Sequence, residues 1–114
     1  MANNRKIGSD KEKLAVEYLK EYNIDILAMN YRTKQGEIDI IGKDGECIVF
    51  IEVKYRSSTT YGYPEEAVNI SKQRKIRSVA TYYMLTHNIP MDSQVRFDVI
   101  SILGNQINHI RNAF

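Results

Sequence analysis

Three acids and a lysine stand among some of the most apolar residues of the chain. In GEIDIIGKDGECIVFIEVK (residues 36–54), Glu37, Asp39, Glu52 and Lys54 alternate with isoleucine, valine and phenylalanine. Two carboxylates held close together repel each other unless a cation or a proton intervenes. Oxygen ligands of this kind suit Mg²⁺ or Mn²⁺, with a backbone carbonyl such as that of Val53 and water molecules completing the shell.

A divalent ion held in this way can polarise a phosphoryl oxygen and lower the pKa of a bound water. Lys54 could then orient the water or offset negative charge that builds on the phosphate. Two acids and a lysine therefore indicate hydrolysis of a phosphodiester rather than of a glycoside, because an adjacent lysine opposes the raised pKa that a glycosidase acid needs.

A β-hairpin is predicted to bring these charges together. Asp44-Gly45 is typical of a two-residue turn, which predicts antiparallel strands over 37–43 and 46–56. In that register Asp39 and Glu52 are diagonal neighbours on one face, about 7–8 Å apart at the backbone.

Period-two alternation divides the hairpin into two faces. The face that carries the two acids also carries Lys54, and it places Glu37 opposite Glu52. The opposite face is predicted to be wholly apolar and to belong to the core; its residues are Ile38, Ile40, Val49, Ile51 and Val53.

The remaining segments predict one α/β domain over residues 1–114, with a mixed β-sheet flanked by helices and the order αβββαββ. Ser9 and Glu12 have the spacing of a capping box, which would begin the first helix. Hydrophobic periodicity and turn signals predict helices over 10–22 and 71–87 and further strands over 24–32, 95–103 and 106–110.

Composition sets limits on function. The chain has 114 residues, of which 43% are hydrophobic and 26% charged, and no apolar run approaches the roughly 20 residues that span a bilayer. Its single cysteine, Cys47, offers no disulfide partner, so the predicted location is the cytoplasm and no membrane is expected. A net charge of +2 says little about partners, and the distribution of charge says more.

Basic and aromatic residues follow the hairpin. Six Lys or Arg residues stand between positions 54 and 77, against Glu65 and Glu66. Such charge is often only a solvated helix face, but basic residues interleaved with tyrosines can also contact phosphates and stack on bases. The residues predicted to contact nucleic acid are Arg56, Tyr61, Lys72, Arg74 and Lys75.

The segments GEIDII (36–41) and FIEVK (50–54) resemble the YraN-like family of small bacterial proteins, a branch of the restriction-endonuclease-like PD-(D/E)XK superfamily. The resemblance extends over nearly the whole chain, although Ile38 replaces the proline in the superfamily's name. It implies a restriction-endonuclease-like fold, with Asp39 and Glu52 as metal ligands and Lys54 as the catalytic lysine. It also implies that Glu12 reaches the same site from the first helix.

Two functions are compatible with these residues. The first is a metal-dependent endonuclease that hydrolyses nucleic acid, expected to be DNA, with Mg²⁺ or Mn²⁺. The second is a catalytically silent module of the same fold that binds nucleic acid. The sequence does not distinguish DNA from RNA, and a homodimer is a weaker expectation.

Overall fold

The computed structural model describes residues 4–57 and 68–114, with side chains from Asp10 onward in the first helix. It confirms the predicted α/β fold and the order αβββαββ. The elements are α1 (Asn4–Glu21), β1 (Asp25–Thr33), β2 (Gly36–Asp44), β3 (Cys47–Arg56), α2 (Ile70–Thr86), β4 (Val95–Leu103) and β5 (Gln106–Ile110). Among the described residues, neither helix is long and apolar enough to cross a bilayer.

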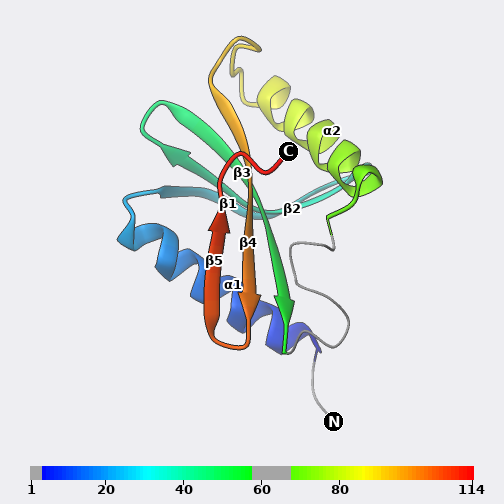
Figure 1. The fold of residues 1–114 in the computed structure, drawn as a ribbon. Coiled ribbons are helices and arrows are strands. Elements are labelled where there is room, and N and C mark those ends of the chain that lie inside the picture. The colour runs from blue at the N-terminus through cyan, green and yellow to red at the C-terminus, as the bar shows by residue number, and fades with distance from the viewer. Residues whose placement is uncertain (1–3, 58–67) are drawn as a thin grey trace.

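The five strands form one mixed sheet in the order β1-β2-β3-β4-β5. Neighbouring strands are antiparallel except β3 and β4, which are parallel. A parallel pair needs a crossover connection, and α2 lies in that connection. Figure 1 shows the twisted sheet with α1 and α2 on opposite sides and the C-terminus beside α2.

Each helix covers its own apolar cluster, so the sheet is buried on both faces. The α2 cluster contains Ile38, Ile41, Ile48, Phe50, Ile76, Val79, Ala80, Tyr83, Met84 and Phe97. The α1 cluster contains Ala15, Leu19, Ile24, Ile40, Val49, Ile51, Ile100 and Ile102. The apolar central strands β2 and β3 are therefore the part of the sequence that must lie between the two helices.

The predicted start of the first helix is wrong. Helix α1 begins at Asn4, so Ser9 lies inside the helix rather than at its start. The residues before Ser9 include no proline, and a single glycine, Gly8, is tolerated inside a helix at a cost of about 1 kcal/mol. The second helix was predicted to within one residue, and its N-cap is Asn69, whose side chain accepts a hydrogen bond from the Lys72 N–H (2.9 Å).

The predicted hairpin register is also wrong, by one residue at the turn. Asp44 pairs with Cys47, so the two-residue loop is Gly45-Glu46, with Gly45 at φ +62°. Asp44 stays in β2, where its carboxylate accepts a hydrogen bond from Arg96 at 3.1 Å. The shift changes the partner of every residue but not the face on which it lies, because side chains alternate with a period of two.

Ile38 was assigned to the wrong face. It packs in the α2 cluster, whereas Ile40 packs in the α1 cluster, so regular alternation fails between them. Asn30, on the neighbouring strand, has φ +52°, and the β1–β2 pairing passes from Met29↔Ile40 to Tyr31↔Ile38 across it. A left-handed residue in a strand kinks the ladder and re-aims the side chains beside it.

A buried charge network joins the strands to the C-terminal end of the chain. Asp98 is fully buried and accepts hydrogen bonds from Arg96 Nε (2.8 Å), from His109 Nε2 (2.7 Å) and from the backbone N–H of Asn112 (2.9 Å). The other ring nitrogen of His109 lies 3.4 Å from the hydroxyl of Tyr18 on α1. The network therefore ties β4, β5, the C-terminal segment and α1 together.

Burial alone would raise the pKa of Asp98, but the hydrogen bonds from His109, Arg96 and Asn112 hold that pKa below its ordinary value. The folded state thus favours the carboxylate more than the unfolded chain does. Its stabilising contribution is complete above the ordinary aspartate pKa of 3.8 and is lost as pH falls below that value.

Replacing Asp98 with asparagine should lower the free energy of unfolding by about 1–3 kcal/mol at neutral pH, because it removes the buried carboxylate that His109, Arg96 and the Asn112 N–H contact, while Arg96 keeps Asp44 as a partner. Urea denaturation measures the change, and Asp92→Asn at an exposed position is the matched control. Equal stability of the two variants would show that the network contributes nothing to the fold.

Candidate functional site

The candidate site lies where β2 and β3 stop pairing. Their regular ladder ends at Ile40↔Ile51. One residue further, the Asp39 carboxylate turns toward β3 and its Oδ2 accepts a hydrogen bond from the Val53 N–H at 2.8 Å. A side chain has therefore taken the place of the β2 backbone as the partner of β3.

Asp39 and Glu52 are brought into direct contact. Each carboxyl group influences the pKa of the other, and Glu52 is only 4% exposed. Burial, and then the charge of Asp39, raise the pKa of Glu52 to about 7. Burial also raises the pKa of Asp39, although its hydrogen bond from Val53 and its interaction with Glu52 act in the opposite direction. The pair can therefore share a proton near neutral pH.

Two lysines approach the same oxygen of Glu52 from different elements. The Nζ atom of Lys54, on β3, lies 3.5 Å from Glu52 Oε1, and the Nζ atom of Lys72, in the first turn of α2, lies 3.7 Å from it. Both positive charges lower the pKa of Glu52, but less than burial and Asp39 raise it. The two lysines thus offset only part of the effect of burial and of Asp39, and Glu52 holds its negative charge less favourably than an exposed glutamate does.

Glu12 reaches this site from α1, through an asparagine that sequence reasoning did not single out for a role. With its amide nitrogen facing the acids, Asn30 donates hydrogen bonds to Glu37 (3.0 Å) and to Glu12 (3.2 Å). Burial and the charge of Asp39 raise the pKa of Glu12. The available signal for Asn30 was its residue type, since asparagine tolerates the left-handed backbone found there.

Glu37 does not face Glu52 as predicted. It pairs with Arg32 across the β1–β2 ladder, and its carboxylate is 3.2 Å from the Arg32 guanidinium. The β2–β3 pairing ends at Ile40↔Ile51, so Glu37 has no partner in the β2–β3 ladder. Glu37 therefore lies at the outer margin of the acidic cluster, with a cation of its own.

The donor set fits a hard divalent ion. Within the described part of the chain, no group of three or more His, Cys, Asp or Glu side chains forms a metal-binding cluster. The acidic oxygens that the site offers to an ion are those of Asp39 and Glu52. Mg²⁺ usually takes one or two carboxylates and keeps several waters. Because the N–H and C=O of a strand residue point to the same edge, the Val53 carbonyl also faces Asp39.

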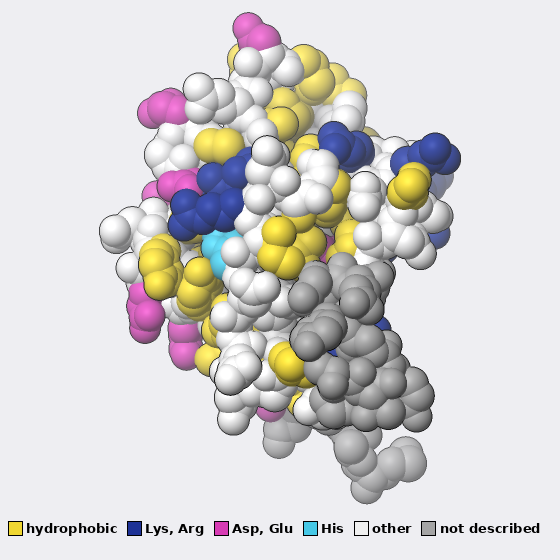
Figure 2. Space-filling view, viewed as in Figure 1, with side chains coloured by type: hydrophobic (Ala, Val, Ile, Leu, Met, Phe, Trp, Pro, Cys, Tyr) yellow, Lys and Arg dark blue, Asp and Glu magenta, His cyan; other side chains and the backbone are white. Residues whose placement is uncertain are grey.

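The residues predicted to contact nucleic acid are distributed unevenly. Lys72 lies in the site itself, Arg74 and Lys75 are exposed on α2, and Arg56 is partly buried at the end of β3. Tyr61 lies outside the described residues. On the face drawn in Figure 2, separate Lys and Arg side chains lie over α2, whereas the largest visible basic patch lies away from α2, beside a histidine.

The protein is a small α/β protein with two acidic residues and two lysines at the open end of its central hairpin. Comparison with known proteins identifies its family. Residues 11–102 match the model of the "Uncharacterised protein family UPF0102". The chain belongs to UPF0102, the YraN-like family, which confirms the resemblance found in the sequence.

The relatives are similar over almost their whole length. A UPF0102 protein of Thermodesulfovibrio yellowstonii is 51% identical, with 95% of each chain covered. One from Lachnoclostridium phytofermentans is 46% identical, covering 97% of this chain and 95% of its own, and one from Rhodococcus opacus is 44% identical with both chains fully covered.

The raised pKa of Glu52 gives the metal-free protein a characteristic pH dependence. The folded state keeps the Glu52 proton to about pH 7, whereas the unfolded chain loses it near 4.5, so the free energy of unfolding should fall as pH rises between these values. The size of the shift limits the loss to about 3 kcal/mol.

Asp39→Asn should reduce that loss, because asparagine keeps an oxygen for the Val53 N–H and removes the charge that raises the pKa of Glu52. Urea denaturation in EDTA at about pH 5 and about pH 8 measures the free energy of unfolding of both proteins. Asp25→Asn, at an exposed position that begins β1, is the control. The same pH dependence in all three proteins would contradict the coupling of the two acids.

Proposed function

We propose that this protein is a metal-dependent endonuclease that hydrolyses phosphodiester bonds of DNA in the cytoplasm. One observation carries the proposal: the Asp39 and Glu52 carboxyls meet at the open end of the β2–β3 ladder while Lys54 and Lys72 contact the same Glu52 oxygen. Acidic residues buried at a cost to stability, beside specific charge partners, are typical of functional sites.

Asp39 and Glu52 would hold Mg²⁺ or Mn²⁺, with the Val53 carbonyl and water completing the shell. When bound, such an ion lowers the pKa of a water and polarises the phosphoryl group. The Val53 N–H fixes the orientation of Asp39, so this carboxylate is positioned before any ligand arrives. The Glu12 carboxylate, held by Asn30, adds a third acid at the edge of the site.

Lys54 and Lys72 have separate tasks in this proposal. Lys54 lies on the same strand as Glu52 and its side chain is 21% exposed, so its ammonium group can orient the attacking water and offset charge on the phosphate. The Lys72 side chain, 38% exposed, contacts Glu52 from α2 and can attract a phosphate oxygen from the other side. With an anionic substrate present, both lysines would exchange Glu52 for the phosphate.

The first test is metal binding without catalysis. Mn²⁺ should raise the melting temperature of the protein, because binding increases the free energy of unfolding by RT ln(1 + [Mn²⁺]/Kd). Asp39→Asn and Glu52→Gln should lose this shift, because each removes one of the two carboxylates. The control Glu46→Gln, in the exposed hairpin turn, should keep it. A shift that is equal in all variants would place the metal elsewhere.

The second test is cleavage. Labelled duplex, single-stranded and junction DNA incubated with Mg²⁺ or Mn²⁺ should be cut by the unaltered protein and not by Asp39→Asn. Lys54→Met should reduce the rate by about 10²–10³-fold, the usual effect of removing one electrostatic stabiliser of the transition state.

Equal cleavage by Asp39→Asn would indicate a contaminating nuclease and contradict the proposal. DNA binding without cleavage by any variant would favour the silent binding module instead. The same assay with an RNA strand of matched sequence decides between DNA and RNA.

A further inference from the structure

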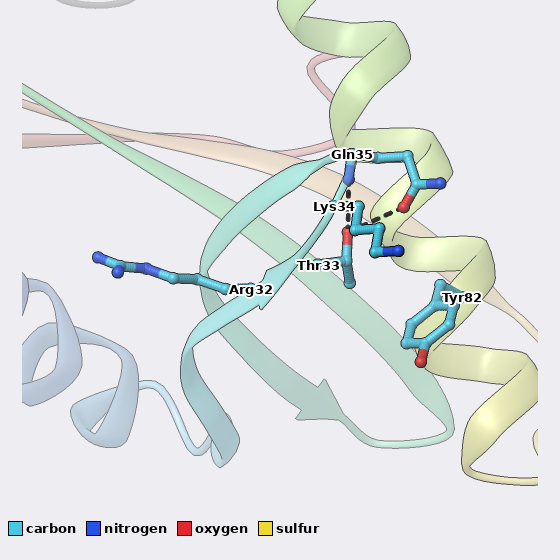
Figure 3. Close-up of a pocket in the computed structure, with 5 residues that line it drawn as sticks. All are labelled: Arg32, Thr33, Lys34, Gln35 and Tyr82. Carbon is cyan, nitrogen blue, oxygen red and sulfur yellow. Dashed lines mark hydrogen bonds between the residues drawn. The ribbon is translucent and has the colours of Figure 1, made fainter.

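A second site lies further along α2 from the acidic one, between the β1–β2 turn and the helix. It is a cleft of about 450 Å³ lined by Arg32, Thr33, Lys34, Gln35 and Tyr82. Figure 3 shows Thr33, Lys34 and Gln35 on the turn side and Tyr82 on α2, whereas Arg32 points away on the other side of the strand. A volume of this size is within the range of sites that bind small organic groups.

The turn side of the cleft is held in one conformation by its own hydrogen bonds. The Gln35 N–H donates to Thr33 Oγ1 at 3.1 Å, and the Thr33 hydroxyl donates to Gln35 Oε1 at 3.1 Å. Gly36, next in the chain, packs against α2, since a Cβ added to it would lie 3.7 Å from the Cβ of Lys75. The turn side of the cleft is therefore already ordered, so binding a ligand there costs little conformational entropy.

Tyr82 has the exposure of a stacking surface. It is 49% exposed, whereas its neighbour Tyr83 is only 6% exposed and stacks on His87. Within the described residues, the Tyr82 ring makes no aromatic or cation–π contact. A flat group that enters the cleft would therefore find a free aromatic face.

The charge of the cleft favours an anionic ligand. Lys34 is exposed and lines it, and no Asp or Glu is among the lining residues. Glu37, the acid that follows the turn, is paired with Arg32 on the far side of the strand. An aromatic face beside an uncompensated lysine suits a nucleotide, which combines a flat base with a negative phosphate.

The cleft and the acidic site lie along the same helix. Lys72 contacts Glu52 in the acidic site, Lys75 lies beside Gly36, and Tyr82 lines the cleft. Lys72 and Tyr82 are ten residues apart, which corresponds to about 15 Å along an α-helix. At about 3.4 Å per nucleotide along one strand, this distance corresponds to about four nucleotides.

We infer that the cleft binds an unpaired nucleotide of the nucleic acid whose backbone reaches the acidic site, with its base stacked on Tyr82 and its phosphate near Lys34. The inference rests on the proposed function for the identity of the ligand. A base inside a duplex is covered on both faces by its neighbours, so stacking on Tyr82 requires an unpaired base. The substrate class is therefore a nucleic acid with a single-stranded segment about four nucleotides from the acidic site.

The experiment measures binding of a fluorescein-labelled 12-nucleotide oligothymidylate and of a 12-base-pair duplex in EDTA, by fluorescence anisotropy over a range of salt concentrations. Tyr82→Ala should weaken binding of the single strand about tenfold, the effect of losing one stacked base, and should change duplex binding little. Tyr82→Phe should restore single-strand binding, because the ring is kept.

Lys34→Gln should weaken single-strand binding and reduce the slope of log K against log salt by about 0.7, the loss expected for one phosphate contact. Tyr82→Ala should leave that slope unchanged, because stacking releases no counterion. Leu85→Ala, which removes a 62% exposed side chain near the C-terminal end of α2, is the matched control and should bind as the unaltered protein does. Circular dichroism confirms that each variant is folded.

Single-strand binding that is the same for Tyr82→Ala and Leu85→Ala overturns the inference, as does the absence of single-strand binding by the unaltered protein. Either result leaves the cleavage assay with Asp39→Asn to decide the proposed function on its own. Conversely, Tyr82-dependent binding by a protein that cuts no substrate supports the cleft and contradicts the nuclease.

Discussion

The hydrogen bond from the Val53 N–H to the Asp39 carboxylate is the interaction on which the site depends. A central strand normally gives its backbone groups to its neighbour, and a buried N–H left without an acceptor costs about 1–3 kcal/mol. Here a side chain accepts that hydrogen bond at 2.8 Å, one residue after the regular β2–β3 pairing ends. The sheet can therefore open at its centre without an unsatisfied donor, and residues from both helices can reach the opening.

That arrangement also explains why the buried carboxylates of Asp39 and Glu52 lower the stability of the folded protein. Asp39 must turn toward β3 to satisfy Val53, which brings it into contact with Glu52 in a region that is almost fully buried. Lys54 and Lys72 contact Glu52 at 3.5 and 3.7 Å, distances longer than those of a close charge-assisted hydrogen bond. Asp98, fully buried in the same sheet, differs: its hydrogen bonds from Arg96, His109 and Asn112 lower its pKa. The hydrogen bonds of Asp98 thus stabilise its carboxylate, whereas the surroundings of Asp39 and Glu52 disfavour theirs.

The sequence predicted the parts of this arrangement that depend on local pattern. The order of elements follows from hydrophobic period and turn residues, and Asp39 and Glu52 lie on the same face because a shift at the turn to Gly45-Glu46 preserves the period of two. The register itself was wrong because Asp44 is held in β2 by Arg96, a residue 52 positions away. The role of Asn30 and the face of Ile38 depend on one left-handed residue in β1, which hydrophobic pattern does not reveal.

The basic segment after the hairpin shows a further limit of what sequence pattern can predict about a site. In the sequence, Lys72, Arg74, Lys75 and Arg77 form one charged run, but a helix directs each of them to a different neighbour. Lys72 reaches Glu52, Arg77 lies over the Phe97 ring at 4.7 Å, and Lys75 packs beside Gly36. Arg74, Lys75 and Arg77 are exposed on α2 between the acidic site and Tyr82. A nucleic acid that follows α2, as the proposed function requires, would thus meet Asp39 and Glu52 at one end and the Tyr82 ring at the other. The proposed nuclease would use this arrangement to distinguish a strand that departs from a duplex from one that remains paired.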